Sequence, residues 1–526
     1  MNKAKKFFVN SVILAGTSFI VQGMDVYFRV FLMSKVGAEV LGFFQLILSV
    51  YSFMLTFAIS GINLATTRLV AEELGKGNVY GAKKAVRNCT IYAICFSGIA
   101  AVFMFFGAGL IGQYWLRDVR TITSIKLLAF ALPCIAITSV WGGYFSAVRR
   151  VSKTASWQFF EQFIKLGIVM LIFLKYTPSG IESCCLAIVI GSVCAELLTF
   201  IYSLILFKLD IKKMKITDTS QKSENIGRRM TGIALPVAIS TYIRSGLVSL
   251  EHMLIPLSLK KHGASIGVAL SVYGIIHGVV LPMLLFPSAI IYAFSGLLVS
   301  EIAELRAMDG DTTSKNTKNS VTNRNINYII TRMLQVTLLF GIGALGIFFT
   351  FANDLAQILG YADGAENYIK MLAPLVPIMY FDHMVDGILK GLNEQVAVMR
   401  YNIIDSGICV VLVIILLPSM GIKGYILVLY LSEIFNTILS TTRLIKITNF
   451  NLSISDYLVK PLICIASSCF IIKTINMLLF TQSIPNLCFV ILFSGGAYLC
   501  LLRLFGSLKK DDILWAKSQL KVGNKV

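Results

Sequence analysis

Ionisable side chains inside long apolar stretches are the residues of this sequence that could carry chemistry. Asp25 and Arg29 lie four residues apart, and Glu161 and Lys165 repeat that spacing in a later stretch. Because residues four apart share one face of a helix, each pair places an acid beside a base. A charged side chain within a membrane span is costly, so each of these residues is a candidate functional residue.

The basic members of this set indicate a site for an anion. Arg29, Lys165 and Arg244 are three cations inside the apolar stretches. A guanidinium binds two phosphate oxygens at once, so we predict that these cations bind the anionic head group of a ligand. An alternative stays open, in which Asp25 with Arg29, and Glu161 with Lys165, neutralise each other and join helices.

The acidic members indicate either sites for a coupling cation or structural pairs. They share a position inside apolar stretches, and they are Asp25, Glu161, Glu196, Glu251, Asp382, Asp386, Asp405 and Glu433. Carboxyl groups in membrane spans commonly relay protons or hold cations. His277 has apolar neighbours in the sequence, which favours a core histidine over a proton relay. No Cys or His spacing typical of a metal site occurs, so we expect no metal and no cofactor.

The composition requires that membrane helices position these residues. Of the 526 residues, 56% are hydrophobic and 14% are charged, and the mean hydropathy is +0.78. Soluble domains carry about 25% charged residues, so this chain has too few charges to coat a water-exposed fold. The net charge of +20 lies in short clusters between apolar runs. The composition therefore excludes a cytosolic enzyme, and the charge pattern excludes a nucleic-acid partner.

Fourteen apolar stretches are long enough to span a membrane, because one span needs about 20 residues. They fall at residues 9–33, 40–66, 88–113, 122–147, 156–175, 183–207, 231–258, 266–300, 329–352, 367–390, 400–418, 424–445, 458–480 and 485–504. With the N-terminus inside, most of the 47 Lys and Arg residues fall in cytoplasmic segments, as the positive-inside rule requires. We predict an all-α integral membrane protein of the cytoplasmic membrane with both termini cytoplasmic.

The two halves of the chain resemble each other. GYFSAVRRVSKTASWQFFEQF from residue 143 matches GILKGLNEQVAVMRYNIIDSG from residue 387, with Glu161 against Asp405. An even number of spans separates matched helices, so the halves have the same orientation. We predict two parallel-repeat six-helix bundles around a central cavity. These are residues 1–229 with a cytoplasmic linker, and residues 230–447. Two further helices and a basic cytoplasmic tail follow at 448–526. The alternative is that apolar helices resemble one another by composition alone.

No motif for bond-making chemistry is present. The sequence contains no G-x-x-x-x-G-K-[ST], H-E-x-x-H or G-x-S-x-G pattern. Without a phosphate-binding loop the chain cannot power transport with ATP by itself. A membrane glycosyltransferase would need paired acids on a large loop, and every loop here is short. We therefore predict that the protein is not an enzyme.

Four segments resemble a known family. FRVFLMSKVGAEVLGFFQL (28–46) and SGINLATTRLVAEEL (60–74) are similar to the N-terminal signature of the polysaccharide-transport branch of the MOP superfamily. WQFFEQFIK around Glu161 and LKGLNEQVAVMRYNIIDS around Asp405 fit the same group. The sequence resembles the stage V sporulation protein B group and, more distantly, the MurJ-type lipid II flippases.

The resemblance implies a flippase for a lipid-linked oligosaccharide or peptidoglycan precursor of the undecaprenyl-pyrophosphate type. Alternating access would carry it across the membrane for cell-wall, spore-cortex or polysaccharide synthesis. The family's cavity arginine on the first helix matches Arg29, whereas Arg244 is assigned by location and Lys165 is the other candidate. The expected partners are the lipid-linked glycan, membrane lipid and envelope glycan-synthesis enzymes, and a monomer is expected. Membrane potential, H⁺ or Na⁺ would drive the cycle.

Two other functions remain as alternatives. A MATE-type cation-coupled multidrug antiporter belongs to the same superfamily, but the three cations inside the spans oppose a cationic ligand. A membrane scaffold without transport activity is the other alternative, and it gives the charges inside the spans no role.

Overall fold

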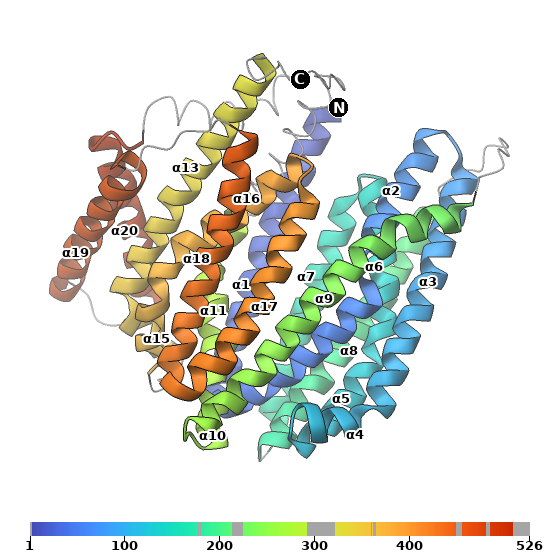
Figure 1. The fold of residues 1–526 in the computed structure, drawn as a ribbon, viewed down its shortest axis with the longest axis horizontal. Helices are drawn as coiled ribbons and strands as arrows, with labels where there is room; N and C mark the ends of the chain where they lie inside the picture. Colours follow the sequence, from blue (N-terminus) through green and yellow to red (C-terminus); the bar gives the residue numbers. More distant parts are fainter. Residues whose placement is uncertain are drawn as a thin grey trace. The chain divides into compact units, whose positions relative to one another are not determined.

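The described part of the chain consists of helices and short turns and contains no β-strand (Figure 1). The computed structural model describes residues 3–176, 178, 180–212, 225–291, 321–358, 360, 364–448, 455–479 and 484–508. The predicted all-α membrane fold is confirmed within these residues. Residues 213–224 of the predicted linker and residues 509–526 of the predicted tail lie outside them.

The elements follow one another in a simple order along the chain. The first part contains α1 (Lys3–Ile59), α2 (Ile62–Gly75), α3 (Val79–Phe106), α4 (Ala108–Leu110), η1 (Ile111–Trp115), η2 (Val119–Thr121), α5 (Ile122–Ala129), α6 (Ala131–Ala147), α7 (Val151–Lys175), α8 (Ile181–Ile211), α9 (Ile226–Lys261), α10 (Ile266–Tyr273), η3 (Gly274–Val280) and α11 (Leu281–Leu285). The second part contains α13 (Val321–Thr350), α14 (Ala352–Ile358), α15 (Ala365–Leu372), η4 (Ala373–Leu375), α16 (Val376–Gly391), α17 (Gln395–Met420), α18 (Ile422–Ile447), η5 (Ser455–Val459), α19 (Lys460–Leu479) and α20 (Ile484–Leu504).

Most of the described helices are long and apolar enough to span a membrane. Among the described residues, 11 helices are long and apolar enough to cross a membrane, or 12 if α5 and α6, bent by 41°, form one span. Each predicted span overlaps a described helix, but the span predicted at 9–33 and most of the span predicted at 40–66 lie in one helix, α1. The apolar part of α20 is short, at Phe489–Leu504. The protein is therefore a multi-pass membrane protein, and the number fourteen stays a prediction.

Gly37 divides α1 into the two spans that the sequence predicts there. Its backbone has φ 82° and ψ 174°, a conformation that is open essentially to glycine alone. The residues before this break carry Asp25 and Arg29, and the residues after it contact α10, where a Cβ at Gly42 would lie 1.9 Å from the carbonyl oxygen of Leu270. One helix label therefore covers two membrane crossings.

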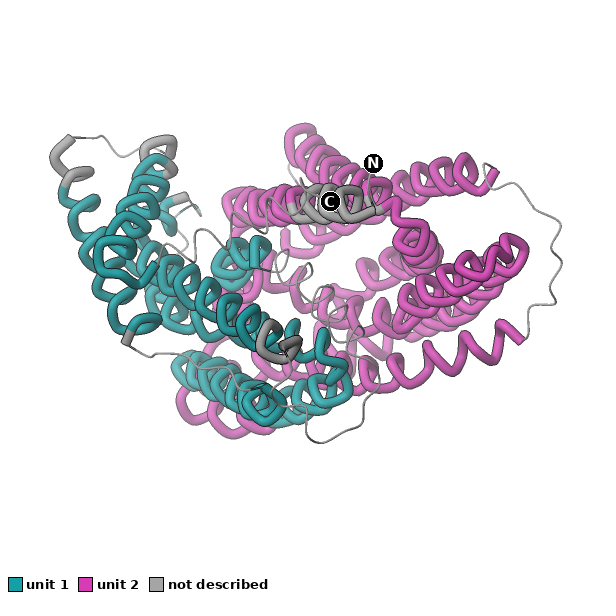
Figure 2. The backbone as a smooth tube through the Cα atoms, turned by 90° about the horizontal axis from the view of Figure 1, so that it is seen from above, with its two compact units in different colours: residues 1–15, 279–409, 422–526 teal, residues 16–278, 410–421 magenta. Residues whose placement is uncertain are grey.

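The chain forms two compact units (Figure 2). Unit 1 contains residues 1–15, 279–409 and 422–526, and unit 2 contains residues 16–278 and 410–421. Helix α9 accordingly belongs to unit 2, whereas α19 and α20 belong to unit 1. The predicted boundaries at 229/230 and 447/448 follow the sequence repeat and stay predictions, as does the central cavity.

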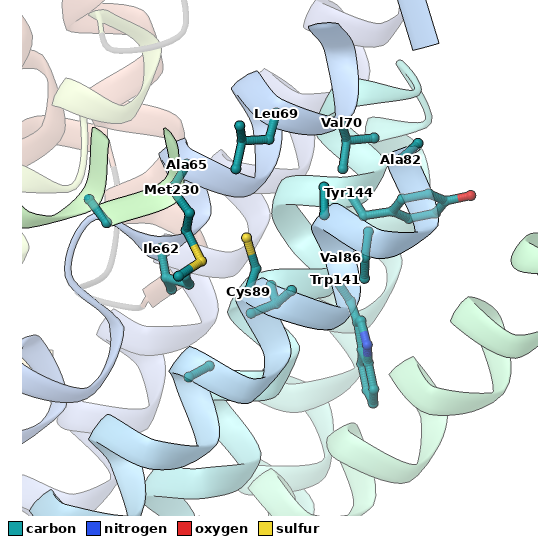
Figure 3. Close-up of a cluster of buried hydrophobic side chains, with 14 of the residues drawn as sticks. Ile62, Ala65, Leu69, Val70, Ala82, Val86, Cys89, Trp141, Tyr144 and Met230 are labelled. Atoms are coloured by element: carbon teal, nitrogen blue, oxygen red, sulfur yellow. The ribbon is translucent and has the colours of Figure 1, made fainter. Parts of the chain in front are cut away.

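The core of unit 2 joins α2, α3, α6 and α9 (Figure 3). Trp141 of α6 stacks on Phe200 and Phe207 of α8, with ring centroids 5.4 and 5.2 Å apart. Gly143 allows α6 to approach α2 closely, because a Cβ there would lie 2.6 Å from the carbonyl oxygen of Asn63. Close packing of this kind fixes how far each helix is shifted along its neighbours. The position of Glu196 on α8 depends on that shift.

The core of unit 1 includes the two C-terminal helices. Tyr498 of α20 donates a hydrogen bond to the carbonyl of Leu339 at 2.8 Å. Ser468 of α19 donates to the carbonyl of Ser494 at 2.7 Å. Both bonds are buried, and buried polar groups need such partners. Helices α19 and α20 are therefore packed into unit 1 and are not loose additions to it.

The turn after α6 and the turn after α16 have the same backbone geometry. Arg149 has φ 56° and Asn393 has φ 66°, each a left-handed residue at the end of a helix. The next residues, Arg150 and Glu394, donate their N–H groups to the carbonyl five residues earlier at 2.8 and 2.9 Å. This hydrogen bond closes a helix C-cap. The matched positions keep the spacing between residues 143 and 387, so this turn of the sequence repeat is repeated in the structure.

Candidate functional site

The first charged cluster lies in unit 2 and involves α1 and α7. Arg29 Nε donates to Asp25 Oδ2 at 2.7 Å, so the predicted pair is present. Lys165 Nζ lies 3.9 Å from Asp25 Oδ1. These side chains are only 20–28% exposed. One carboxylate therefore lies between two cations, and these three groups carry an excess of positive charge.

Lys165 has a partner that the spacing along its own helix does not predict. The i,i+4 pattern pairs it with Glu161, but its described ion pair joins it to Asp25 on another helix. Its ammonium nitrogen also lies 4.7 Å from the centre of the Phe28 ring, whose face attracts a cation. Glu161 is still near enough to interact electrostatically with Lys165. Packing between helices, and not spacing within one, determines this contact.

Glu161 of α7 and Glu196 of α8 form a pair of carboxyl groups near Lys165. Their side chains are hydrogen-bonded to each other. Two carboxyl groups this close repel each other when both are ionised. Both groups also act electrostatically on Tyr51 of α1. We call Asp25, Arg29, Glu161, Lys165 and Glu196 the paired-charge site.

A backbone carbonyl also binds the Arg29 guanidinium. Arg29 Nη1 donates to the carbonyl oxygen of Gly278 at 3.2 Å. Gly278 lies in η3, a π-helical segment, and such segments occur frequently at functional sites. The third nitrogen, Nη2, makes no polar contact with any described residue. Two nitrogens therefore hold the guanidinium in place.

Arg244 is not connected to this network. It is exposed on α9 and forms no hydrogen bond or ion pair with the part of the chain that the structure describes. Glu251, two turns later on the same helix, acts electrostatically on Tyr273 of α10. The structure therefore leaves Arg244 open to a ligand but does not place it with Arg29.

Four acidic residues form a second cluster, in unit 1. They are Asp382 and Asp386 on α16, Asp405 on α17 and Glu433 on α18, and the other three all act electrostatically on Glu433. Asp382 is only 4% exposed. Within the described ranges, neither Asp382 nor Glu433 forms a salt bridge. We call these four residues the carboxylate site.

Neutral donors and acceptors surround the carboxylate site. Asp382 accepts hydrogen bonds from Asn436 Nδ2 at 2.9 Å and Ser440 Oγ at 2.7 Å. Asp405 accepts from Ser432 Oγ at 2.7 Å. The oxygen Oδ1 of Asn436 is buried without a hydrogen-bond partner among the described residues. Sequence reasoning missed these three donors, although their spacing of four residues in an apolar run places them on one face of α18.

A histidine cluster in unit 2 was also missed. The ring centroids of His252 and His277 lie 4.6 Å apart, and Tyr273 Oη lies 2.9 Å from His252 Nδ1. His277 is therefore not isolated among apolar side chains as its sequence neighbours suggest. No spacing rule could have found this cluster, because the two histidines lie on different elements.

The two sites offer opposite electrostatic chemistry. The paired-charge site presents guanidinium and ammonium groups that suit a phosphate, whereas the carboxylate site presents acids and amide or hydroxyl oxygens that suit a proton or an alkali cation. Among the described residues, no group of three or more His, Cys, Asp or Glu side chains is arranged to hold a metal ion.

The comparison of sequences agrees with the resemblance inferred from the residues. A family model described as "Polysaccharide biosynthesis protein" matches residues 7–255. Stage V sporulation protein B of Bacillus subtilis (strain 168) is 26% identical over 516 residues, which cover 96% of this chain and 97% of that protein. The predicted resemblance is therefore confirmed.

Solved structures share the fold. The lipid II flippase MurJ in an inward closed conformation superposes with a TM-score of 0.64 and 13% identity, over 94% of this chain and 98% of that chain. An inward-facing MATE family multidrug resistance transporter of the MOP superfamily gives a TM-score of 0.58 and 13% identity, over 83% and 98%. The chain therefore has the fold of the MOP superfamily and, by sequence, resembles its polysaccharide-transport branch.

Proposed function

We propose that this protein is a flippase that moves a lipid-linked oligosaccharide or peptidoglycan precursor across the cytoplasmic membrane by alternating access. The carrier lipid is of the undecaprenyl-pyrophosphate type, and the product serves cell-wall, spore-cortex or polysaccharide synthesis. The observation that supports this proposal most is Arg29, a guanidinium inside a membrane span that Asp25 and the Gly278 carbonyl hold in place. Such an arrangement is costly in a membrane unless it serves a ligand.

The substrate explains why both charge and lipid access are needed. A diphosphate bearing sugars cannot cross hydrocarbon unaided, whereas a polyprenyl tail prefers to stay there. Arg29, with Lys165 nearby and Arg244 as a further contact, binds the diphosphate while the tail remains in lipid. An inside-negative membrane potential favours outward movement of an anion by about 2.3 kcal/mol per charge per 100 mV. The membrane potential therefore contributes to the driving force.

The carboxylate site provides coupling to a cation in this proposal. Asp382 and Glu433 lie among other acids without a salt bridge in the described part of the chain. Binding of H⁺ or Na⁺ would relieve the repulsion between these carboxylates. Release of this H⁺ or Na⁺ on the other side of the membrane then returns the transporter to its starting conformation after the substrate has left.

We further propose that both termini are cytoplasmic, because the basic residues between spans then lie mostly inside. The protein acts as a monomer, binds no nucleic acid and has no enzymatic activity of its own. Envelope glycan-synthesis enzymes supply and use its lipid-linked substrate.

Reconstitution tests the proposed function directly. Proteoliposomes containing the purified protein receive a fluorescent glycan on undecaprenyl diphosphate, and dithionite quenching reports how much fluorophore reaches the outer leaflet. We expect faster equilibration with wild type than with Arg29→Ala. Arg503→Ala serves as the matched control, because Arg503 is exposed on α20 and has no polar partner among the described residues. Equal rates for wild type and protein-free vesicles would contradict the proposal.

Depletion in cells identifies the substrate. When synthesis of the protein is stopped, the lipid-linked intermediate that it moves should accumulate on the inner leaflet, where mass spectrometry of extracted lipids can identify its glycan. Failure of any lipid-linked glycan to accumulate, in growing or sporulating cells, would count against a flippase.

A cation-coupled multidrug antiporter is the second candidate, and the carboxylate site favours it. Asp382 and Glu433, which form no salt bridge with the described residues, suit both a coupling cation and a cationic drug. Efflux of a cationic dye from proteoliposomes under an imposed pH or Na⁺ gradient distinguishes the two functions. Dye efflux without movement of the lipid-linked glycan would support the antiporter.

A further inference from the structure

Phe28 of α1 lies beside the paired-charge site, although it carries no charge. Residues three and four apart share one face of a helix, so Asp25 has both Phe28 and Arg29 one turn further along α1. Phe28 is only 3% exposed. Lys165 Nζ, on α7, lies 4.7 Å from the centre of the Phe28 ring. A buried aromatic ring therefore contacts one of the two cations of the site.

The Lys165 ammonium has a charge partner but no close hydrogen-bond acceptor. Its ion pair with Asp25 Oδ1 is 3.9 Å long, which is beyond the length of a hydrogen bond. The other oxygen of that carboxylate, Oδ2, accepts from Arg29 Nε at 2.7 Å. No residue in the described part of the chain accepts a hydrogen bond from Lys165. An ammonium carries three N–H donors, so the donors of Lys165 are available to a ligand.

An aromatic ring and a carboxylate stabilise an ammonium in different ways. A carboxylate in close contact occupies an N–H donor and cancels the charge. The face of a ring attracts the cation and leaves both its donors and its charge in place. Glu161 and Glu196 also attract Lys165 electrostatically, but neither forms an ion pair with it. The Phe28 ring therefore stabilises the ammonium without removing the charge that a phosphate needs.

We propose that Phe28 is a positioning residue that holds the Lys165 ammonium for the second phosphate of the lipid-linked diphosphate, while Arg29 binds the first. The two cations contact different oxygens of one carboxylate, Asp25, so each phosphate of one head group can meet one cation. Without the ring, the ammonium turns toward the neighbouring acids and binds a phosphate less tightly. The identity of the ligand rests on the proposed function, whereas the link between Phe28 and Lys165 does not.

A stability cycle without any ligand tests that link. Phe28→Leu keeps an apolar side chain but removes the ring, and Lys165→Met keeps a long side chain but removes the charge. Phe28→Leu should lower the Tm both in wild type and in the Lys165→Met background, because a buried ring is lost. The loss should be about 1–2 °C smaller in the Lys165→Met background, where no cation remains for the ring to attract. Equal losses in the two backgrounds would overturn the proposal.

A binding measurement then tests the consequence for a diphosphate. Farnesyl diphosphate is titrated into the protein in lipid nanodiscs, with farnesyl monophosphate as the reference that lacks the second phosphate. Phe28→Leu should raise the Kd for farnesyl diphosphate about five- to tenfold, because the ammonium is no longer held for that phosphate. The Kd for farnesyl monophosphate should change less than about twofold. In the Lys165→Met background, Phe28→Leu should have no further effect on either Kd.

Matched variants separate positioning from the general loss of an aromatic ring. Phe31 also joins α1 to α7, but it contacts the ring of Phe173, with centroids 6.5 Å apart. Phe31→Leu should therefore leave the Kd for farnesyl diphosphate almost unchanged. Phe28→Tyr keeps the ring face and should keep the Kd within about twofold of wild type. Phe28→Met replaces Phe28→Leu in every comparison if the leucine variant does not fold.

The possible outcomes distinguish this proposal from the proposed function. An unchanged Kd for Phe28→Leu, or equal effects of Phe28→Leu and Phe31→Leu, would refute the positioning role of Phe28. Equal rises in the Kd for the diphosphate and the monophosphate would refute the assignment of Lys165 to the second phosphate. If wild type fails to bind farnesyl diphosphate, the proposed diphosphate ligand is wrong, and the stability cycle alone decides on the link between Phe28 and Lys165.

Discussion

The paired-charge site and the carboxylate site lie on matched helices of a repeat, but their chemistry is opposite. Glu161 on α7 corresponds to Asp405 on α17, and each lies near an acid on the next helix, Glu196 or Glu433. Within the described residues, the first pair has a neighbouring lysine, Lys165, that acts on both acids, and the second pair has none. The repeated backbone determines where the acids lie, and substitutions around them determine which ion each site can hold.

The common backbone makes this contrast informative. The turns that precede α7 and α17 have the same cap geometry, with a left-handed residue at Arg149 and at Asn393. The matched helices α7 and α17 therefore begin after the same type of turn. Substitutions that remove charge at the paired-charge site should affect substrate binding, and those at the carboxylate site should affect cation coupling.

The largest effect is expected at the paired-charge site. Arg29→Ala should lower the rate of flipping by about 10- to 100-fold, because a charge-assisted contact to the diphosphate is lost. The dithionite assay measures this rate, and the expression level and Tm of the variant show that it folds. If Asp382→Asn lowered the rate by the same factor, the two sites would not have separate roles.

The carboxylate site should affect coupling and not substrate binding. Asp382→Asn removes a charge that interacts with three other acids, so the rate of flipping should lose its dependence on an imposed pH or Na⁺ gradient. The Kd for farnesyl diphosphate should stay within about twofold of wild type. Asp354→Asn on α14 is the control, because this acid lies in unit 1 outside the carboxylate site. A weaker affinity of Asp382→Asn for farnesyl diphosphate would show that the carboxylate site also takes part in substrate binding, which contradicts separate roles.

Ion pairs at the corresponding helix ends should differ in their effect on stability. Asp210 is buried and accepts from Tyr144 at 3.0 Å and from Lys153 at 2.6 Å, and it also pairs with Arg150. Asp210→Asn should lower the free energy of unfolding by about 3 kcal/mol, because two cations lose their partner.

The corresponding pair in the second half is more exposed. Glu394 pairs with Arg443 at 2.8 Å, and their side chains are 25% and 39% exposed. Ion pairs between exposed side chains contribute little, so Glu394→Gln should leave the Tm close to that of wild type. Thermal unfolding of both variants in one detergent makes the comparison. A larger loss for Glu394→Gln than for Asp210→Asn would reverse the expected order.

The smallest effect is expected at the left-handed turn residues. Arg149→Gly should raise the free energy of unfolding by up to about 1 kcal/mol, because a left-handed conformation strains most side chains. Asn393→Gly should change it by only a few tenths of a kcal/mol, since asparagine tolerates this conformation. Thermal unfolding of the two variants measures the difference. Equal shifts would show that arginine and asparagine strain the two turns equally, which would contradict this prediction.

The sequence predicted the features that depend on local hydrophobicity and spacing. Long apolar stretches predicted the helices, and the matched segments from residues 143 and 387 predicted the repeat. The spacing of Asp25 and Arg29 predicted their ion pair, because both residues lie on one helix. Each of these predictions needs only the geometry of a single element.

Contacts between helices could not be predicted in the same way. Lys165 pairs with Asp25 and not with Glu161, because the register between α1 and α7 depends on packing along their whole length. The contact of Arg29 with the Gly278 carbonyl has the same origin. No rule in the sequence says which backbone carbonyl an arginine on another element will reach.

The reversed polarity of the helix-end ion pairs has a consequence for assembly in the membrane. A duplicated bundle risks exchanging equivalent helices between its copies while the chain is being inserted. Were α7 to meet α18, Arg150 would face Arg443, and were α17 to meet α8, Glu394 would face Asp210. Like charges brought together in this way repel each other. Exchanged helices would therefore place like charges together at these two positions, where the native pairings place opposite charges.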